Sequence, residues 1–133
     1  MFTALGIDSE DSKRSGPRMP ELALIFAIAV AGGIGSVIRS FITPWTGFMP
    51  WGVLITNSLA AIAIGLLLGG PDFLPENGQI VMVGFAGGLS TFSGVARASF
   101  GYWFKGRILQ SATTLILNVL APLGALWMTL NLG

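Results

Sequence analysis

Cysteine and histidine are both absent from the 133-residue sequence, and charged residues make up only 10% of it. Without cysteine and histidine the chain has no disulfides, no thiol catalysis, no histidine acid–base chemistry and no site for a His/Cys-bound transition metal. An average soluble domain is about a quarter charged, so this chain has too little charge to cover a water-facing surface. The net charge of +1 does not indicate the basic surface that nucleic-acid binding requires. Soluble enzymes, nucleic-acid-binding proteins and disordered regulators are therefore poor fits.

Apolar residues and glycine are what the chain has in excess. Hydrophobic residues account for 53% of the sequence, and the mean hydropathy is +0.77. The 19 glycines are about twice the usual share. This composition predicts a small, glycine-rich integral membrane protein.

Four apolar runs follow a polar start, each near the roughly 20 residues that a helix needs to cross a bilayer. The runs cover about residues 22–42, 51–68, 78–100 and 108–130. Residues 1–20 mix charges with Ser, Gly and Pro, which is typical of a flexible tail. We expect this polar tail followed by one four-helix transmembrane domain over residues 21–133, an all-α integral membrane fold.

The basic residues outside the spans do not settle the orientation. Lys13, Arg14 and Arg18 lie on one side of the predicted membrane, and Lys105 and Arg107 lie on the other. The positive-inside rule needs an asymmetry that these numbers lack. One interpretation is that the tail charges lie too far from the first span to count fully. The other is that both orientations have similar energy, which would permit antiparallel dimers.

Intramembrane polar residues are functional candidates because they are costly in lipid. No Asp or Glu lies within a predicted span, which argues against proton-coupled antiport and against an acidic cation filter. Arg39 and Arg97 are near span ends, where snorkelling to the interface is the alternative. The other polar residues are mostly neutral donors, and several of the hydroxyls are expected to bond their own helix: Asn57, Ser58, Ser90, Thr91, Ser93, Thr113, Thr114 and Asn118. Such donors with Arg favour an anion over a cation.

The third run is unusual in its centre. Residues 84–94 contain four glycines and three hydroxyl residues within eleven positions. Close helix packing explains glycines at this spacing. A helix break near Gly87-Gly88 is the second interpretation, because irregular backbone at membrane depth is tolerated where it is buried or lines a site.

Three motifs in order connect the chain to a known family. They are Gly32-Gly33-Ile34-Gly35-Ser36-Val37-Ile38-Arg39, Gly52-Val53-Leu54-Ile55-Thr56-Asn57 and Gly87-Gly88-Leu89-Ser90-Thr91-Phe92-Ser93. In this order and spacing they resemble the CrcB/Fluc fluoride channels over roughly residues 22–130.

The resemblance implies a dual-topology antiparallel dimer in the cell membrane, with two narrow fluoride pores and a structural sodium ion at its centre. The implied sodium ligands are the backbone carbonyls of Gly87 and Ser90. Asn57 matches the family's pore-lining asparagine, Arg39 its vestibule arginine and Phe92 one of its two pore phenylalanines. The ion pathway expected on this basis also includes Thr91, Ser93, Thr114 and Asn118.

One departure from the family pattern concerns the second pore phenylalanine, whose position holds Val95. Aromatic ring edges carry partial positive charge that suits a small anion, and valine has no such edge. Since the family's pores take residues from both subunits, we expect this chain to be one half of a heterodimeric channel that exports fluoride passively. A homodimer with altered conduction, a non-conducting structural or regulatory subunit, and a small transporter of another substrate are the alternatives.

Overall fold

A computed structural model describes residues 20–69 and 74–132 of the chain. The polar tail predicted over residues 1–20 lies outside the described residues, apart from Pro20. The described chain forms five helices: α2 (Glu21–Ile42), α3 (Trp51–Gly69), α4 (Glu76–Leu89), α5 (Phe92–Phe104) and α6 (Ile108–Leu132).

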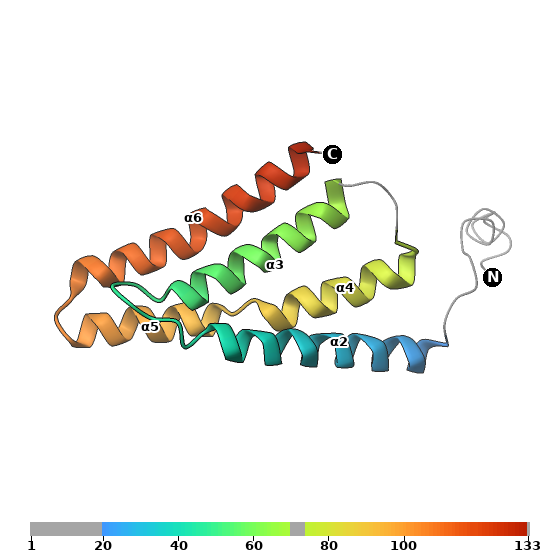
Figure 1. Cartoon of the computed structure of the whole chain (residues 1–133), viewed down its shortest axis with the longest axis horizontal. Helices are drawn as coiled ribbons and strands as arrows, with labels where there is room; N and C mark the ends of the chain where they lie inside the picture. Colours follow the sequence, from blue (N-terminus) through green and yellow to red (C-terminus); the bar gives the residue numbers. More distant parts are fainter. Residues whose placement is uncertain (1–19, 70–73, 133) are drawn as a thin grey trace, which may run out of the picture.

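The helices form a bundle in which α2 packs mainly on α4, and α3 mainly on α6 (Figure 1). The α4–α5 pair runs nearly end to end along the molecule, with α5 against α6 and α4 against α3. Following the chain, α2 and α4–α5 run in one direction and α3 and α6 in the other (Figure 1). Because α3 and α6 run parallel, residues at similar heights on these two helices face the same part of the bundle.

Four helical segments are long and apolar enough to cross a membrane: α2, α3, the combined stretch Glu76–Phe104 and α6. Their outer surfaces carry many exposed large hydrophobic side chains, among them Leu22, Phe41, Leu109 and Leu132. Lipid is the environment that accommodates such a surface, because an ordinary soluble monomer exposes only limited apolar patches. The prediction of an all-helical protein with four membrane-length helices is confirmed.

Two residues with extended backbone separate α4 from α5. Ser90 has φ −77° and ψ 153°, and Thr91 has φ −154° and ψ 113°. The helix continues through Gly87 and Gly88 and ends at Leu89. The irregular backbone therefore follows the two glycines instead of coinciding with them.

Glycines allow α2 and α4 to approach each other at backbone distance. A Cβ atom on Gly35 would collide with the carbonyl oxygen of Phe85, and one on Gly88 would collide with the carbonyl oxygen of Gly32. On the other side of the bundle, a Cβ on Gly65 would collide with the Thr129 hydroxyl of α6. This is the small-residue packing that membrane helices use in place of a hydrophobic driving force.

Candidate functional site

The site is centred on Asn57 of α3, which faces the two extended residues between α4 and α5. Its Oδ1 accepts a hydrogen bond from the backbone N–H of Thr91 at 2.7 Å, and its Nδ2 donates to the carbonyl oxygen of the same residue at 3.3 Å. One side-chain amide thus pairs with both backbone groups of a residue that has left the helix. In a bilayer this pairing matters because no water is present to satisfy those groups.

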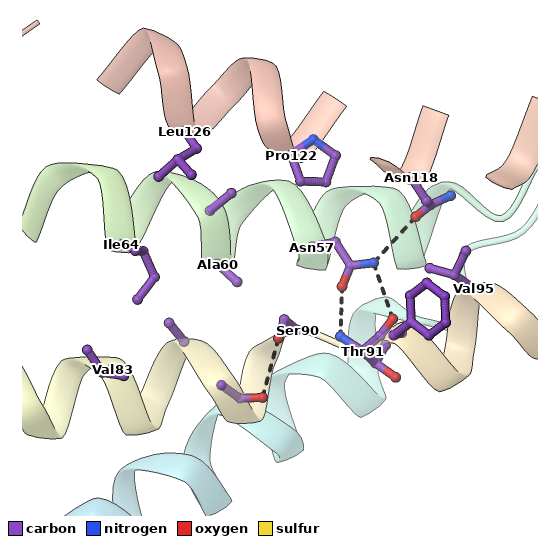
Figure 2. Close-up of a pocket in the computed structure, with 14 residues that line it drawn as sticks. Asn57, Ala60, Ile64, Val83, Ser90, Thr91, Val95, Asn118, Pro122 and Leu126 are labelled. Carbon is purple, nitrogen blue, oxygen red and sulfur yellow. Dashed lines mark hydrogen bonds between the residues drawn. The ribbon is translucent and has the colours of Figure 1, made fainter. Parts of the chain in front are cut away.

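Asn118 extends the network to α6. Its Oδ1 accepts from Asn57 Nδ2 at 3.5 Å, and its Nδ2 donates to the carbonyl oxygen of Thr114 at 2.9 Å. Only 7% of Asn118 is exposed. The two asparagines therefore link α3, α6 and the α4–α5 junction through one chain of hydrogen bonds (Figure 2).

The Thr91 side chain caps the helix that follows it. Its Oγ1 accepts a hydrogen bond from the backbone N–H of Gly94 at 3.0 Å, which satisfies one of the free donors at the start of α5. The same oxygen lies 3.1 Å from the Ser93 hydroxyl, whose side chain is exposed. Ser93 therefore joins the network through Thr91.

Arg39 and Ser36 reach the end of α4 from α2. Arg39 Nη1 donates to the carbonyl oxygen of Ser90 at 3.2 Å, and Ser36 Oγ donates to the carbonyl oxygen of Gly88 at 3.3 Å. The Ser90 hydroxyl in turn donates to the Gly87 carbonyl at 3.5 Å, a weak contact. Both Ser90 and Thr91 thus have their carbonyl groups engaged by side chains of neighbouring helices.

A groove of about 450 Å³ opens beside this network (Figure 2). Helices α3, α4, α5 and α6 all contribute to its wall, through Asn57, Ala60, Ala61, Ile64, Val83, Ala86, Gly87, Ser90, Thr91, Phe92, Val95, Asn118, Pro122 and Leu126. A Cβ on Gly87 would meet nothing within 4 Å, so the wall is open at this residue. The groove lies between α3 and α6 on one side and α4 on the other, and it is open at the surface of the chain.

Phe92 and Val95 differ sharply in exposure although both line the groove. Phe92 is 74% exposed, whereas Val95 is 2% exposed and is among the most buried side chains of the described chain. Phe92 therefore presents its ring outward from the bundle. Val95 fills space within the bundle, at the position where the resemblance implies the second pore phenylalanine.

Thr114 is fully buried, and its hydroxyl has no hydrogen-bond partner among the described residues. It lies one helical turn before Asn118 on α6 and does not line the groove. A buried hydroxyl without a partner is uncommon in native proteins and calls for an explanation such as water, an ion or a second chain.

The structure thus brings together most of the residues that the sequence predicts for the site. Asn57, Thr91, Asn118, Phe92, Ser90 and Gly87 line one groove, while Arg39, Ser93 and Thr114 lie beside it. The apolar lining formed by Ile64, Val83 and Leu126 was not among the predicted site residues. For Ile64 and Leu126 the sequence signal is spacing, because residues seven or eight positions after an asparagine on a helix lie on the same face.

Comparison with known proteins places the chain in a family. The profile described as "CrcB-like protein, Camphor Resistance (CrcB)" matches residues 26–130, which span all five helices. The chain belongs to the CrcB-like family. The resemblance that the three motifs indicate is therefore confirmed.

Several CrcB-like relatives carry a functional name. The chain is 33% identical over 110 residues to a protein of Pyrococcus furiosus named "Fluoride-specific ion channel FluC", with 77% of this chain and 89% of the relative covered. Proteins with the same name from Pyrococcus horikoshii and Geobacter metallireducens are 34% and 31% identical, with 87% and 91% of their lengths covered. The similarity extends over most of each relative.

Proposed function

We propose that this CrcB-like protein is a subunit of a fluoride-selective channel in the cell membrane, which exports fluoride passively and lowers its cytoplasmic concentration. The observation that carries the proposal is the Asn57–Thr91–Asn118 network on a groove wall, in a chain similar to proteins named as fluoride-specific ion channels. Passive conduction requires no catalytic residue, and the protein is not an enzyme.

The chemistry of the groove suits a small anion. Fluoride must exchange its water shell for donors, and the polar end of the groove offers amide and hydroxyl groups from Asn57, Thr91 and Asn118. The exposed ring of Phe92 adds a positive edge, and Ser93 adds a hydroxyl beside it. Among the described residues no carboxylate lines the groove, so no negatively charged side chain there repels an anion.

Arg39 supplies a positive charge beside this network. From the last turn of α2, its guanidinium donates to the Ser90 carbonyl at the junction of α4 and α5 (Figure 1). A fixed cation beside an ion pathway raises the local anion concentration. Thr114, one turn before Asn118 on α6 and fully buried, would extend the pathway from the groove into the bundle.

A second subunit would close the pore, because the groove of this chain is open at its surface. An antiparallel partner, as in a dual-topology dimer, would cover the open side of the groove and meet the outward ring of Phe92. Val95 gives this chain no second pore phenylalanine. We therefore propose a heterodimer with a CrcB-like subunit that has both phenylalanines, in which one of the two pores is complete. A homodimer would have Val95 at both corresponding positions.

A sodium ion at the subunit interface fits the groups present near Gly87. Carbonyl oxygens are hard ligands that suit this ion, and the carbonyls of Gly87 and Ser90 would hold it together with the same pair from the second subunit. Each carbonyl has two lone pairs, so the contacts to Ser90 Oγ and Arg39 leave capacity for a metal. The open space at Gly87 gives access. The ion would supply positive charge that binds the two α4–α5 junctions together.

Reconstitution into liposomes tests the proposal. Purified protein, alone and together with a CrcB-like paralogue that has both phenylalanines, would be assayed for fluoride efflux, with chloride efflux as the selectivity control. Fluoride efflux that appears only with the paralogue supports the heterodimer, and efflux from the protein alone supports the homodimer. Absence of fluoride efflux in both compositions would overturn the channel proposal and leave a structural subunit.

A further inference from the structure

The polarity of the residues that line the groove changes along its length (Figure 2). One end is polar and contains Asn57, Asn118 and the Ser90–Thr91 segment. The other end is lined by apolar side chains from three helices: Ala60, Ala61, Ile64, Val83, Pro122 and Leu126. The only polar groups of this groove therefore lie at one end of it.

The apolar stretch is long compared with an ion. Ile64 follows Asn57 on α3, and Leu126 follows Asn118 on the parallel helix α6. At 1.5 Å of rise per residue, these pairs are separated by about 10 Å and about 12 Å along their helices. Both helices therefore give a similar length for the apolar stretch. This length is about a third of the roughly 30 Å hydrocarbon core of a bilayer.

Such a stretch opposes the passage of an anion. Removing an ion from water without replacing its hydrogen bonds is very costly, and hydrophobic constrictions block conduction by excluding water. Backbone groups offer no compensation, since helical N–H groups are bonded internally and Pro122 has no N–H. Pro122 also cannot donate to the carbonyl of Asn118, so its position adds an acceptor near the groove rather than a donor.

We propose that Ile64, Val83 and Leu126 form an apolar barrier that limits fluoride passage along the groove of this chain. This inference rests on the proposed function and goes beyond it. Side chains outside the polar network would limit the rate at which fluoride passes. The barrier predicts that a single hydroxyl introduced in the apolar stretch accelerates fluoride flow.

The test exchanges Leu126 for two residues of nearly equal size. Leu126→Thr introduces a hydroxyl, whereas Leu126→Val removes the same bulk and stays apolar. Fluoride efflux would be measured in liposomes for both variants and the unmodified chain, alone and with the paralogue. We expect Leu126→Thr to raise efflux about tenfold above Leu126→Val, equivalent to about 1.4 kcal/mol of barrier.

Size-exclusion chromatography shows whether the Leu126 variants fold. If one of them does not, the Ile64→Thr and Ile64→Val pair repeats the test on α3. Equal efflux of the Thr and Val variants at both positions, in liposomes where the unmodified chain conducts, overturns the barrier and leaves the channel proposal intact. No fluoride efflux from any variant or from the unmodified chain, in either composition, overturns both proposals.

Discussion

Asn57 pairs with Thr91 as one peptide group pairs with another, through a donor and an acceptor on the same side chain. The pairing joins α3 to the point where α4 gives way to α5, across 34 positions of sequence. It satisfies the backbone of an extended residue in a protein whose surroundings supply no water. A residue predicted to line an ion pathway thus also holds the backbone of Thr91 in place.

Asn57→Ala should destabilise the fold, because it leaves the N–H and carbonyl of Thr91 and the Oδ1 of Asn118 without this partner. Unpaired buried polar groups cost about 1–3 kcal/mol each, with lower values common for bonds between membrane helices. Thermal unfolding of the purified protein in detergent, followed by circular dichroism, should show a lower midpoint temperature.

Asn131→Ala is the matched control for this measurement. Asn131 is exposed, and its Nδ2 donates only within its own helix, to the Trp127 carbonyl at 2.7 Å. Its loss should leave the midpoint almost unchanged. Equal midpoints for the two alanine variants would mean that the Asn57–Thr91 pairing contributes nothing to stability.

The coarse fold follows from the sequence because lipid imposes simple rules. Four apolar runs of membrane length become helices, since only internally bonded backbone is stable in a bilayer. The packing of Gly84 and Gly88 against another helix is also predictable, because small residues four positions apart lie on one helix face. Even Asn57 and Asn118 are recognisable as needing partners, since no helix can satisfy a side-chain amide alone.

The sequence does not show which groups these polar side chains pair with. Asn57 meets Thr91 and Asn118 only after three helices have packed, and Arg39 meets Ser90 across 51 positions. The end of α4 at Leu89 also depends on packing, because Gly88 is needed inside the helix, against Gly32. The burial of Val95 is a property of the bundle and not of the local pattern.

Gly35→Ala should disrupt the contact between α2 and α4. The added Cβ would collide with the Phe85 carbonyl and lie 2.9 Å from the backbone nitrogen of Leu89. Overpacking of this kind costs about 1–3 kcal/mol, so the thermal midpoint should fall. Gly33→Ala, on the same helix with nothing within 4 Å of the added atom, is the control and should not lower it. A fall of equal size in both variants would contradict close packing at Gly35 as its cause.

Thr114→Val should raise the stability of the protein. The change keeps the side-chain shape and removes a fully buried hydroxyl that has no partner among the described residues, a gain of about 1 kcal/mol. Thr113→Val serves as the comparison, because the Thr113 hydroxyl donates to the Leu109 carbonyl at 2.6 Å and its loss brings no such gain. A lower midpoint for Thr114→Val would show instead that the hydroxyl binds water, an ion or a second subunit.

Val95→Phe should not restore a second pore phenylalanine. Val95 is almost completely enclosed, so a ring at this position has to displace its neighbours, at a cost of about 1–3 kcal/mol. The variant should therefore unfold at a lower temperature than Val95→Ile, which adds a single methyl group, and its fluoride efflux should not exceed that of the unmodified chain. Higher efflux with an unchanged midpoint would show that the ring turns outward into the groove.

Phe92→Ile should abolish fluoride efflux through the pore that this chain completes, while leaving the protein folded. The Phe92 ring lies in the groove and is 74% exposed, so its replacement removes an aromatic edge without emptying a packed core. Phe41 on α2 has the same exposed fraction and lies outside the groove, which makes Phe41→Ile the matched control. Both variants should match the unmodified chain in thermal midpoint, and only Phe92→Ile should lose efflux in liposomes. If both variants conducted equally, the aromatic ring would have no part in passage, and the anion would depend on the amide and hydroxyl groups of Asn57, Thr91 and Asn118 alone.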